Sequence, residues 1–121
     1  MAKRILVVDD DPEIRNLLRM TFESVGYEVK TALDGRIALD TIKNDPPDLI
    51  TSDVIMPTLN GFEFCDRIKK DKELQHIPVI LLTSRDDEAN LFYHDFTEPD
   101  AYIKKPFDAE ELLEIVRKLL G

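Results

Sequence analysis

Hydrophobic residues along the chain form short runs that alternate with longer amphipathic segments. Ile5–Val8 and Ile77–Leu82 are apolar at nearly every position, which is typical of strands buried on both faces of a parallel sheet. Residues 27–32 alternate between polar and apolar side chains and predict a more exposed strand. The segment that leads to Asp53 and residues 101–104 predict two further strands. The pattern therefore predicts five strands.

Between and after these strands, apolar residues recur every three to four positions, as on one face of a helix. Helices are predicted over residues 12–25, 35–44, 61–70, 86–96 and 109–120. The first of them carries an apolar stripe at Ile14, Leu17, Leu18, Met20, Phe22 and Val25. Asp11 and Asp108 are the expected N-caps of the first and last helix, and Asp108 forms the pattern of a capping box with Glu111.

Strict alternation of strands and helices implies an all-parallel sheet with helices on both faces and right-handed crossovers. The chain has 121 residues, of which 43% are hydrophobic and 34% charged. This length and balance predict one globular domain over residues 1–121, without an output domain. The fold class is therefore predicted to be a doubly wound α/β fold.

No apolar run reaches the roughly 20 residues that span a bilayer, and the N-terminus lacks the features of a signal peptide. A cytoplasmic location is expected. Cys65 is the only cysteine, which excludes an internal disulfide. The net charge of −9 argues against non-specific binding to nucleic acid or anionic membranes. It suggests a basic partner or a site built from carboxylates, unless it serves only solubility.

The predicted strands deliver polar groups to one edge of the sheet, where the carboxyl ends of parallel strands meet. Asp9 and Asp10 follow the first strand, Asp53 ends the third, Thr83 the fourth, and Lys105 follows the fifth. Two carboxylates 4 Å apart repel by about 4 kcal/mol at an effective dielectric constant of about 20. Mg²⁺ prefers such oxygen ligands, and a lysine suits a phosphoryl oxygen. The set indicates Mg²⁺-assisted phosphoryl transfer with a carboxylate as the acceptor.

The segments that carry these residues are similar to the four signature motifs of receiver domains, the phosphoacceptor modules of two-component response regulators. They are Val7–Pro12, Ser52–Pro57, Thr83-Ser84 and Tyr102–Phe107. They occur in the family's order and spacing, and the resemblance covers the whole chain. It implies a flavodoxin-like (βα)5 fold with strand order 2-1-3-4-5.

The resemblance implies that Asp53 accepts a phosphoryl group from a sensor histidine kinase or a histidine phosphotransfer domain. Asp10, Asp53 and the backbone carbonyl of Ile55 are then expected to bind Mg²⁺, or Mn²⁺ in its place, with Asp9 acting through water. Lys105 is expected to pair with the phosphoryl group. The implied role is regulatory rather than enzymatic, apart from self-phosphorylation and self-dephosphorylation of Asp53.

Thr83 and Tyr102 are implied to form a switch pair. Thr83 moves toward the phosphoryl oxygen, and Tyr102 turns inward behind it. The added charge of about −1.5 to −2 supplies the contacts that favour the active state. The face expected to change for partner binding consists of residues 86–96, the strand over 101–104 and the last helix.

Two positions that tune phosphoryl hydrolysis in the family are occupied here by Ile55 and Arg85. Our hypothesis is that the apolar side chain of Ile55 shields the phosphoryl group from water and slows self-hydrolysis. Glu98-Pro99 stands where the family commonly has Gly-Ala, which stiffens the connection before the last strand. The region over residues 86–96 is therefore expected to differ in conformation or in output partner.

The implied partners are the kinase or phosphotransfer domain and an unidentified output protein. Ile14 and Pro106 resemble the surface by which receivers dock onto a kinase helix pair. No direct binding to nucleic acid or membranes is expected, and the chain is expected to be a monomer or a phosphorylation-dependent dimer.

Three other functions would use parts of the same pattern. A pseudo-receiver would bind partners without phosphorylation, but the complete acidic set with Thr83 and Lys105 argues against it. A phosphatase of the haloacid dehalogenase type also uses two acids after the first strand, here Asp9 and Asp11, but its cap insertion and further acids are not visible. A flavodoxin is disfavoured because no glycine-rich phosphate loop follows the first strand. Three other reactive side chains are expected to be structural: Cys65, His76 and His94.

Overall fold

The computed structural model describes residues 2–83 and 98–121, and its five strands form one parallel sheet in the order β2-β1-β3-β4-β5. The strands are β1 Arg4–Val8, β2 Glu28–Ala32, β3 Leu49–Asp53, β4 Val79–Thr83 and β5 Ala101–Lys104. The helices described are α1 Pro12–Glu23, α2 Gly35–Asn44, α3 Gly61–Lys70 and α4 Ala109–Leu120. The predicted fold class and strand order are confirmed. The helix predicted over residues 86–96 lies outside the described residues.

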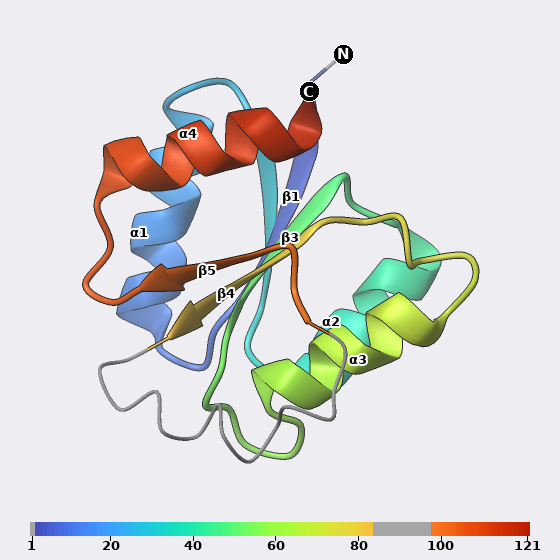
Figure 1. Cartoon of the computed structure of the whole chain (residues 1–121). Helices are drawn as coiled ribbons and strands as arrows, with labels where there is room; N and C mark the ends of the chain where they lie inside the picture. Colours follow the sequence, from blue (N-terminus) through green and yellow to red (C-terminus); the bar gives the residue numbers. More distant parts are fainter. Residues whose placement is uncertain (1, 84–97) are drawn as a thin grey trace.

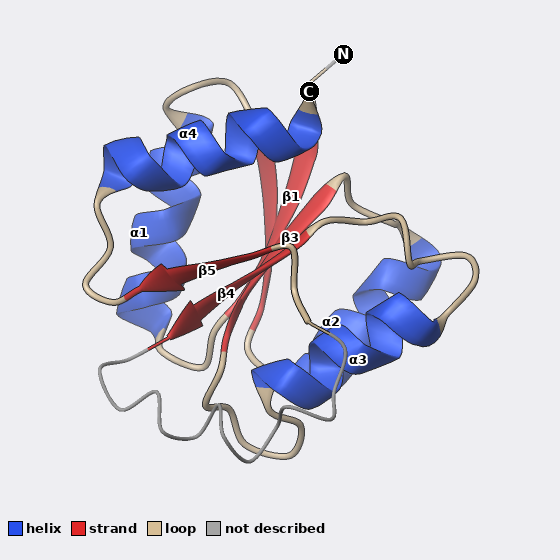
Figure 2. Ribbon diagram, viewed as in Figure 1, coloured by secondary structure: helices blue, strands red, loops and turns tan. Residues whose placement is uncertain are grey.

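The helices cover both faces of the sheet, with α1 and α4 on one face and α2 and α3 on the other (Figures 1 and 2). Successive strand residues point to opposite faces, so each strand contributes to two apolar layers. The layer under α1 and α4 includes Val7, Leu18, Phe22, Ile80 and Val116. The layer under α2 and α3 includes Leu6, Ile42, Ile50, Phe64 and Ile68. No helix in the described part of the chain is long and apolar enough to span a bilayer.

The apolar stripe predicted for α1 is only partly buried, which corrects the sequence interpretation. Leu18 and Phe22, four residues apart, are the buried residues of the helix. Leu17 and Met20 are 49% and 58% exposed, and Val25, 48% exposed, lies beyond the end of the helix at Glu23, two residues earlier than predicted. A helix that lies on a sheet buries one narrow face, and neighbouring residues are about 100° apart around its axis. Helix α1 therefore presents apolar side chains to solvent.

Helix capping also differs from the prediction at one of the helices. Asp108 caps α4, but its carboxylate accepts from the backbone N–H of Glu110 (2.9 Å) rather than from that of Glu111. A complete capping box occurs instead at α3, where Asn60 and Glu63 accept from each other's backbone N–H groups. This box fixes the start of the helix that follows the loop after Asp53.

Candidate functional site

Three acids and a lysine meet at the carboxyl edge of the sheet. Asp9, Asp10 and Asp53 each place a carboxylate oxygen within 4.8 Å of the other two. The Nζ atom of Lys105 lies 3.0 Å from Oδ2 of Asp9 and 3.2 Å from Oδ1 of Asp53. We call these four residues the acidic cluster. Asp11 caps α1, as predicted, by accepting from the backbone N–H two residues later.

Asp9 and Asp10 have very different surroundings although they are adjacent. Asp9 is 1% exposed, and its carboxylate also accepts from the backbone N–H of Asp11 at 2.9 Å. Its carbonyl oxygen accepts from the guanidinium of Arg15 at 2.8 Å. Asp10 is exposed. Arg15 was missed in the sequence, although its place one helical turn after Asp11 puts it on the side of α1 that can reach back to the strand end.

The electrostatics of the cluster show an excess of negative charge. Burial raises the pKa of Asp53, and Asp9 adds to this effect, while the nearby ammonium of Lys105 opposes it. Burial alone would lower the pKa of Lys105, but Asp53 and Asp9 outweigh burial and raise it. Lys105 therefore stays charged, and its one ammonium group is shared by Asp9 and Asp53.

The two predicted switch residues lie on the adjacent strands. Thr83 ends β4 and is 3% exposed, and its carbonyl oxygen accepts from the backbone N–H of Lys105 at 2.7 Å. Tyr102 on β5 is 40% exposed, and its ring centroid lies 6.4 Å from that of Phe62. Lys104, the last residue of β5, is exposed.

The loop after β3 places one apolar side chain in solvent next to the cluster. Ile55 is 66% exposed, whereas Val54 and Met56 on either side of it are buried. Arg85 lies outside the described residues. Thr51, two residues before Asp53, is fully buried, and its hydroxyl has no hydrogen-bond partner in the described part of the chain. The sequence offered no signal for this orphaned hydroxyl, because a threonine is an ordinary strand residue.

An apolar recess lies beside Lys105, between α1 and the start of α4. Ile14 and Pro106, the two predicted docking residues, both line it. The other lining residues are Leu17, Thr21, Lys105, Phe107 and Ala109. The exposed part of α1 thus joins the end of β5 in one surface.

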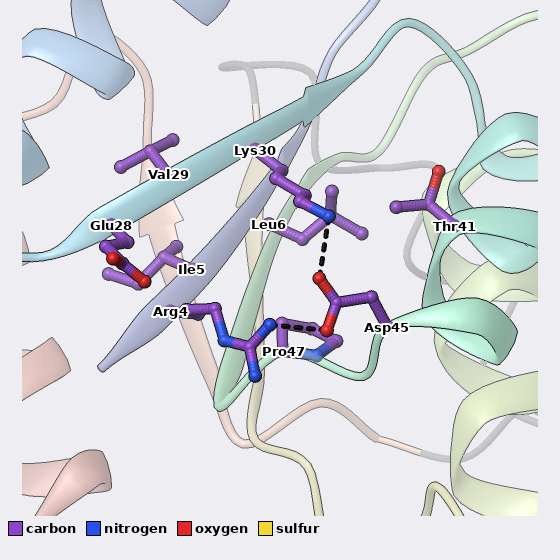
Figure 3. A pocket seen from close by; sticks show the side chains of 9 residues that line it. All are labelled: Arg4, Ile5, Leu6, Glu28, Val29, Lys30, Thr41, Asp45 and Pro47. Carbon is purple, nitrogen blue, oxygen red and sulfur yellow. Dashed lines mark hydrogen bonds and ion pairs between the residues drawn. The ribbon is translucent and has the colours of Figure 1, made fainter. Parts of the chain in front are cut away.

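A second cavity, of about 180 Å³, lies at the opposite edge of the sheet, between β1, β2 and the end of α2 (Figure 3). Its mouth carries Asp45, which forms ion pairs with Arg4 and with Lys30. Two carboxylates, Asp45 and Glu28, and two cations, Arg4 and Lys30, line this cavity, so it lacks the charge excess of the acidic cluster.

Of the three side chains expected to be structural, Cys65 and His76 lie within the described residues. Cys65 is buried, and burial raises the pKa of its thiol to about 12, which leaves it unreactive at neutral pH. His76 is exposed, and His94 lies outside the described residues.

The donor set of the acidic cluster fits a hard divalent cation. Three carboxylates and one ammonium carry a net charge of about −2, and carboxylate oxygens are the ligands that Mg²⁺ prefers. An open side is also needed because Mg²⁺ usually keeps several waters. Asp10 is exposed and provides that side.

Comparison with known proteins agrees with the fold and with the acidic cluster. A family model described as the response regulator receiver domain matches residues 5–117. Response regulator MprA of Mycolicibacterium vanbaalenii is 42% identical over 120 residues, which cover 99% of this chain and 51% of that protein. The chain thus spans about half the length of the curated relatives it matches.

Solved structures of receiver domains are also similar to this chain. The receiver domain of a signal transduction histidine kinase from Syntrophus aciditrophicus is 35% identical, with a TM-score of 0.92 over 98% of this chain and 90% of that one. The receiver domain of the sensor histidine kinase PA1611 from Pseudomonas aeruginosa has a magnesium ion coordinated in its active-site cleft. It is 26% identical, with a TM-score of 0.88 over 100% of this chain and 99% of that one. On the fold, the acidic cluster and these matches, this chain belongs to the response regulator receiver domains.

Proposed function

We propose that this receiver domain takes a phosphoryl group from a phosphohistidine onto Asp53. The acidic cluster is the observation that carries the proposal, because it places Asp53 at a strand end beside two acids and a lysine. A carboxylate oxygen of Asp53 attacks phosphorus, the phosphorus–nitrogen bond breaks, and its electron pair leaves with the imidazole. The product is an acyl phosphate on Asp53.

Asp10, Asp53 and the carbonyl of Ile55 hold Mg²⁺ directly in this proposal, and Asp9 acts through water. The surroundings of the two adjacent acids support this division. Asp9 is buried and already bonded to Lys105 and to a backbone N–H, whereas Asp10 is exposed. When bound, the ion would neutralise charge on the phosphoryl oxygens. Mn²⁺ offers similar ligand preferences and would serve in its place.

Lys105 and Thr83 hold the transferred phosphoryl group in this proposal. The Lys105 ammonium is 3.2 Å from Asp53, within reach of a group attached there. Thr83 moves toward the phosphoryl oxygen, and Tyr102 turns inward from its partly exposed position. The surface of β5 and α4 would thereby change for an output partner.

Ile55 is proposed to slow the hydrolysis of the acyl phosphate. Its side chain is 66% exposed next to Asp53, so it can cover the approach of water to the phosphoryl group. Replacing it with a polar residue, Ile55→Asn, is expected to speed self-dephosphorylation. An unchanged dephosphorylation rate in the purified protein would rule this role out. Arg85 is proposed to tune the same rate.

The sensor kinase or phosphotransfer partner is proposed to dock on the recess formed by Ile14 and Pro106. Ile14→Asp is expected to slow phosphotransfer from the partner but to leave phosphorylation by acetyl phosphate unchanged. Met20→Asp is the matched control, because Met20 is exposed on the same helix outside the recess. Equal effects of the two variants would argue against docking at the recess.

The deciding experiment incubates the protein with Mg²⁺ and acetyl phosphate and measures the added phosphoryl mass. We expect labelling of the wild type, none of Asp53→Asn, and none after removal of divalent cations. No labelling of the wild type would favour the pseudo-receiver. Turnover of an external phosphomonoester would instead favour the phosphatase.

A further inference from the structure

A pair of aromatic side chains connects α3 to strand β5. Phe62, the second residue of α3, is 3% exposed and belongs to the apolar layer that includes Val54 of the loop after Asp53. Its ring lies 6.4 Å from that of Tyr102, centroid to centroid, with an angle of 53° between the ring planes. Tyr102 is 40% exposed. A buried ring on α3 therefore supports a partly exposed ring on β5.

The start of α3 lies directly on the backbone of the proposed acceptor. The N–H of Gly61 donates to the carbonyl oxygen of Val54 at 2.7 Å. A Cβ atom on Gly61 would lie 2.4 Å from the carbonyl oxygen of Asp53 and 2.8 Å from Cα of Val54, so no side chain fits there. Because the two backbones are in direct contact, a shift of Asp53 and Val54 would carry the first turn of α3, and Phe62 with it.

We infer that Phe62 is a positioning residue for Tyr102, holding its ring outward and coupling it to the backbone at Asp53. The inference rests on the proposed phosphorylation of Asp53 and on the proposed switch at Tyr102. In this inference Asp53 is coupled to Tyr102 through α3 as well as through Thr83. A contact biases a two-state equilibrium only if it differs between the states. The Phe62–Tyr102 contact exists in the outward arrangement, so its loss favours the inward one.

Fluorine NMR of fluorotyrosine-labelled protein tests this inference. The chain has three tyrosines, and Tyr102→Phe identifies the signal of interest. Beryllofluoride with Mg²⁺ defines the inward end point. Without beryllofluoride, Phe62→Leu is expected to move the Tyr102 signal toward that end point, with an increase of about three- to tenfold in the ratio of inward to outward rings.

Phe64→Leu is the matched control, because Phe64 also lies on α3, is fully buried and belongs to the same apolar layer. It is expected to lower the thermal midpoint as Phe62→Leu does, without moving the Tyr102 signal. If the Tyr102 signal moves equally in Phe62→Leu and Phe64→Leu, the proposed role of Phe62 is wrong. If beryllofluoride leaves the wild-type Tyr102 signal in place although Asp53 is labelled, the switch and this inference both fail. If Asp53 itself is not labelled, the proposed function fails.

Discussion

The two edges of the sheet differ in how their carboxylates are balanced by cations. At the edge where β1 and β2 begin, Asp45 lies between Arg4 and Lys30, and all three side chains are 32–58% exposed. At the carboxyl edge, Asp9 and Asp53 share the ammonium of Lys105, and Asp10 is the third carboxylate beside them; Asp9 is 1% exposed. The first edge is balanced, because Glu28 also lies beside these residues, whereas the second has a surplus of buried negative charge.

The pKa shifts follow from this difference. Hydrogen bonds from Lys30 and Arg4 lower the pKa of Asp45. Burial raises the pKa of Asp53 in spite of Lys105. An exposed carboxylate with its own cations is a structural ion pair, whereas half-buried carboxylates that outnumber their cations favour a divalent ion and a reacting phosphoryl group. The balance of charge and burial, rather than the presence of a cavity, distinguishes the functional edge.

The largest expected contrast comes from removing one lysine at each edge. Lys105→Met leaves Asp9 and Asp53 without their ammonium, and we expect a loss of about 3 kcal/mol in the free energy of unfolding. Lys30→Met removes an exposed partner of Asp45, which keeps Arg4, and should hardly change stability. Urea denaturation in the absence of divalent ions measures both. Similar losses in the two variants would contradict the comparison.

Added Mg²⁺ should stabilise the protein through the carboxyl edge alone. A ligand that binds only the folded state adds about 2.7 kcal/mol when its free concentration is about 100 times its dissociation constant. Asp10→Asn is expected to remove most of this stabilisation, and Asp45→Asn none of it. Thermal unfolding at increasing Mg²⁺ concentrations measures the effect. Retention of the full response by Asp10→Asn would place the ion elsewhere.

The two edges should respond oppositely to the change from acid to amide. The raised pKa of Asp53 means that its contribution to stability is present below its ordinary pKa and is lost as pH rises through the raised value. Asp53→Asn should therefore be more stable than the wild type at neutral pH, with the difference disappearing in acid. The measurement is urea denaturation from acidic to neutral pH without divalent ions.

Asp45 provides the matched case with the opposite sign. Its pKa is lowered, so its contribution is present above its ordinary pKa and is lost as pH falls through the lowered value. Asp45→Asn should be less stable than the wild type at neutral pH. If Asp53→Asn and Asp45→Asn change the free energy of unfolding in the same direction at neutral pH, the two edges do not differ as described.

The smallest expected effect on stability comes from Thr51, two residues before Asp53 on β3. The buried hydroxyl of Thr51 lacks a partner, so Thr51→Val should raise the free energy of unfolding by about 1 kcal/mol. Labelling of Asp53 by acetyl phosphate should be unaffected. Chemical denaturation tests the first expectation, and a loss of stability would mean that the hydroxyl has a bonding partner in solution.

Local patterns in the sequence were sufficient for most of the fold. The apolar runs predicted the described strands. Because parallel strands all run in the same direction, the residues at their carboxyl ends lie at one edge of the sheet. The sequence alone therefore groups Asp9, Asp10, Asp53 and Lys105 at one site. The burial of α1 was predicted less accurately. Hydrophobic periodicity identifies a stripe of apolar residues on a helix, but it does not show how many of them the sheet buries.

The sequence by itself determined the order of elements, the caps at Asp11 and Asp108 and the set of groups at the carboxyl edge, because these depend on local propensity and topology. Only the tertiary structure decided which acid is buried, where Lys105 points and which ring contacts Tyr102. Burial and contact depend on chain segments that are distant in sequence. The excess charge around Asp53 is likewise a property of packing, since the same residue types at the other edge form a balanced, exposed pair of bridges.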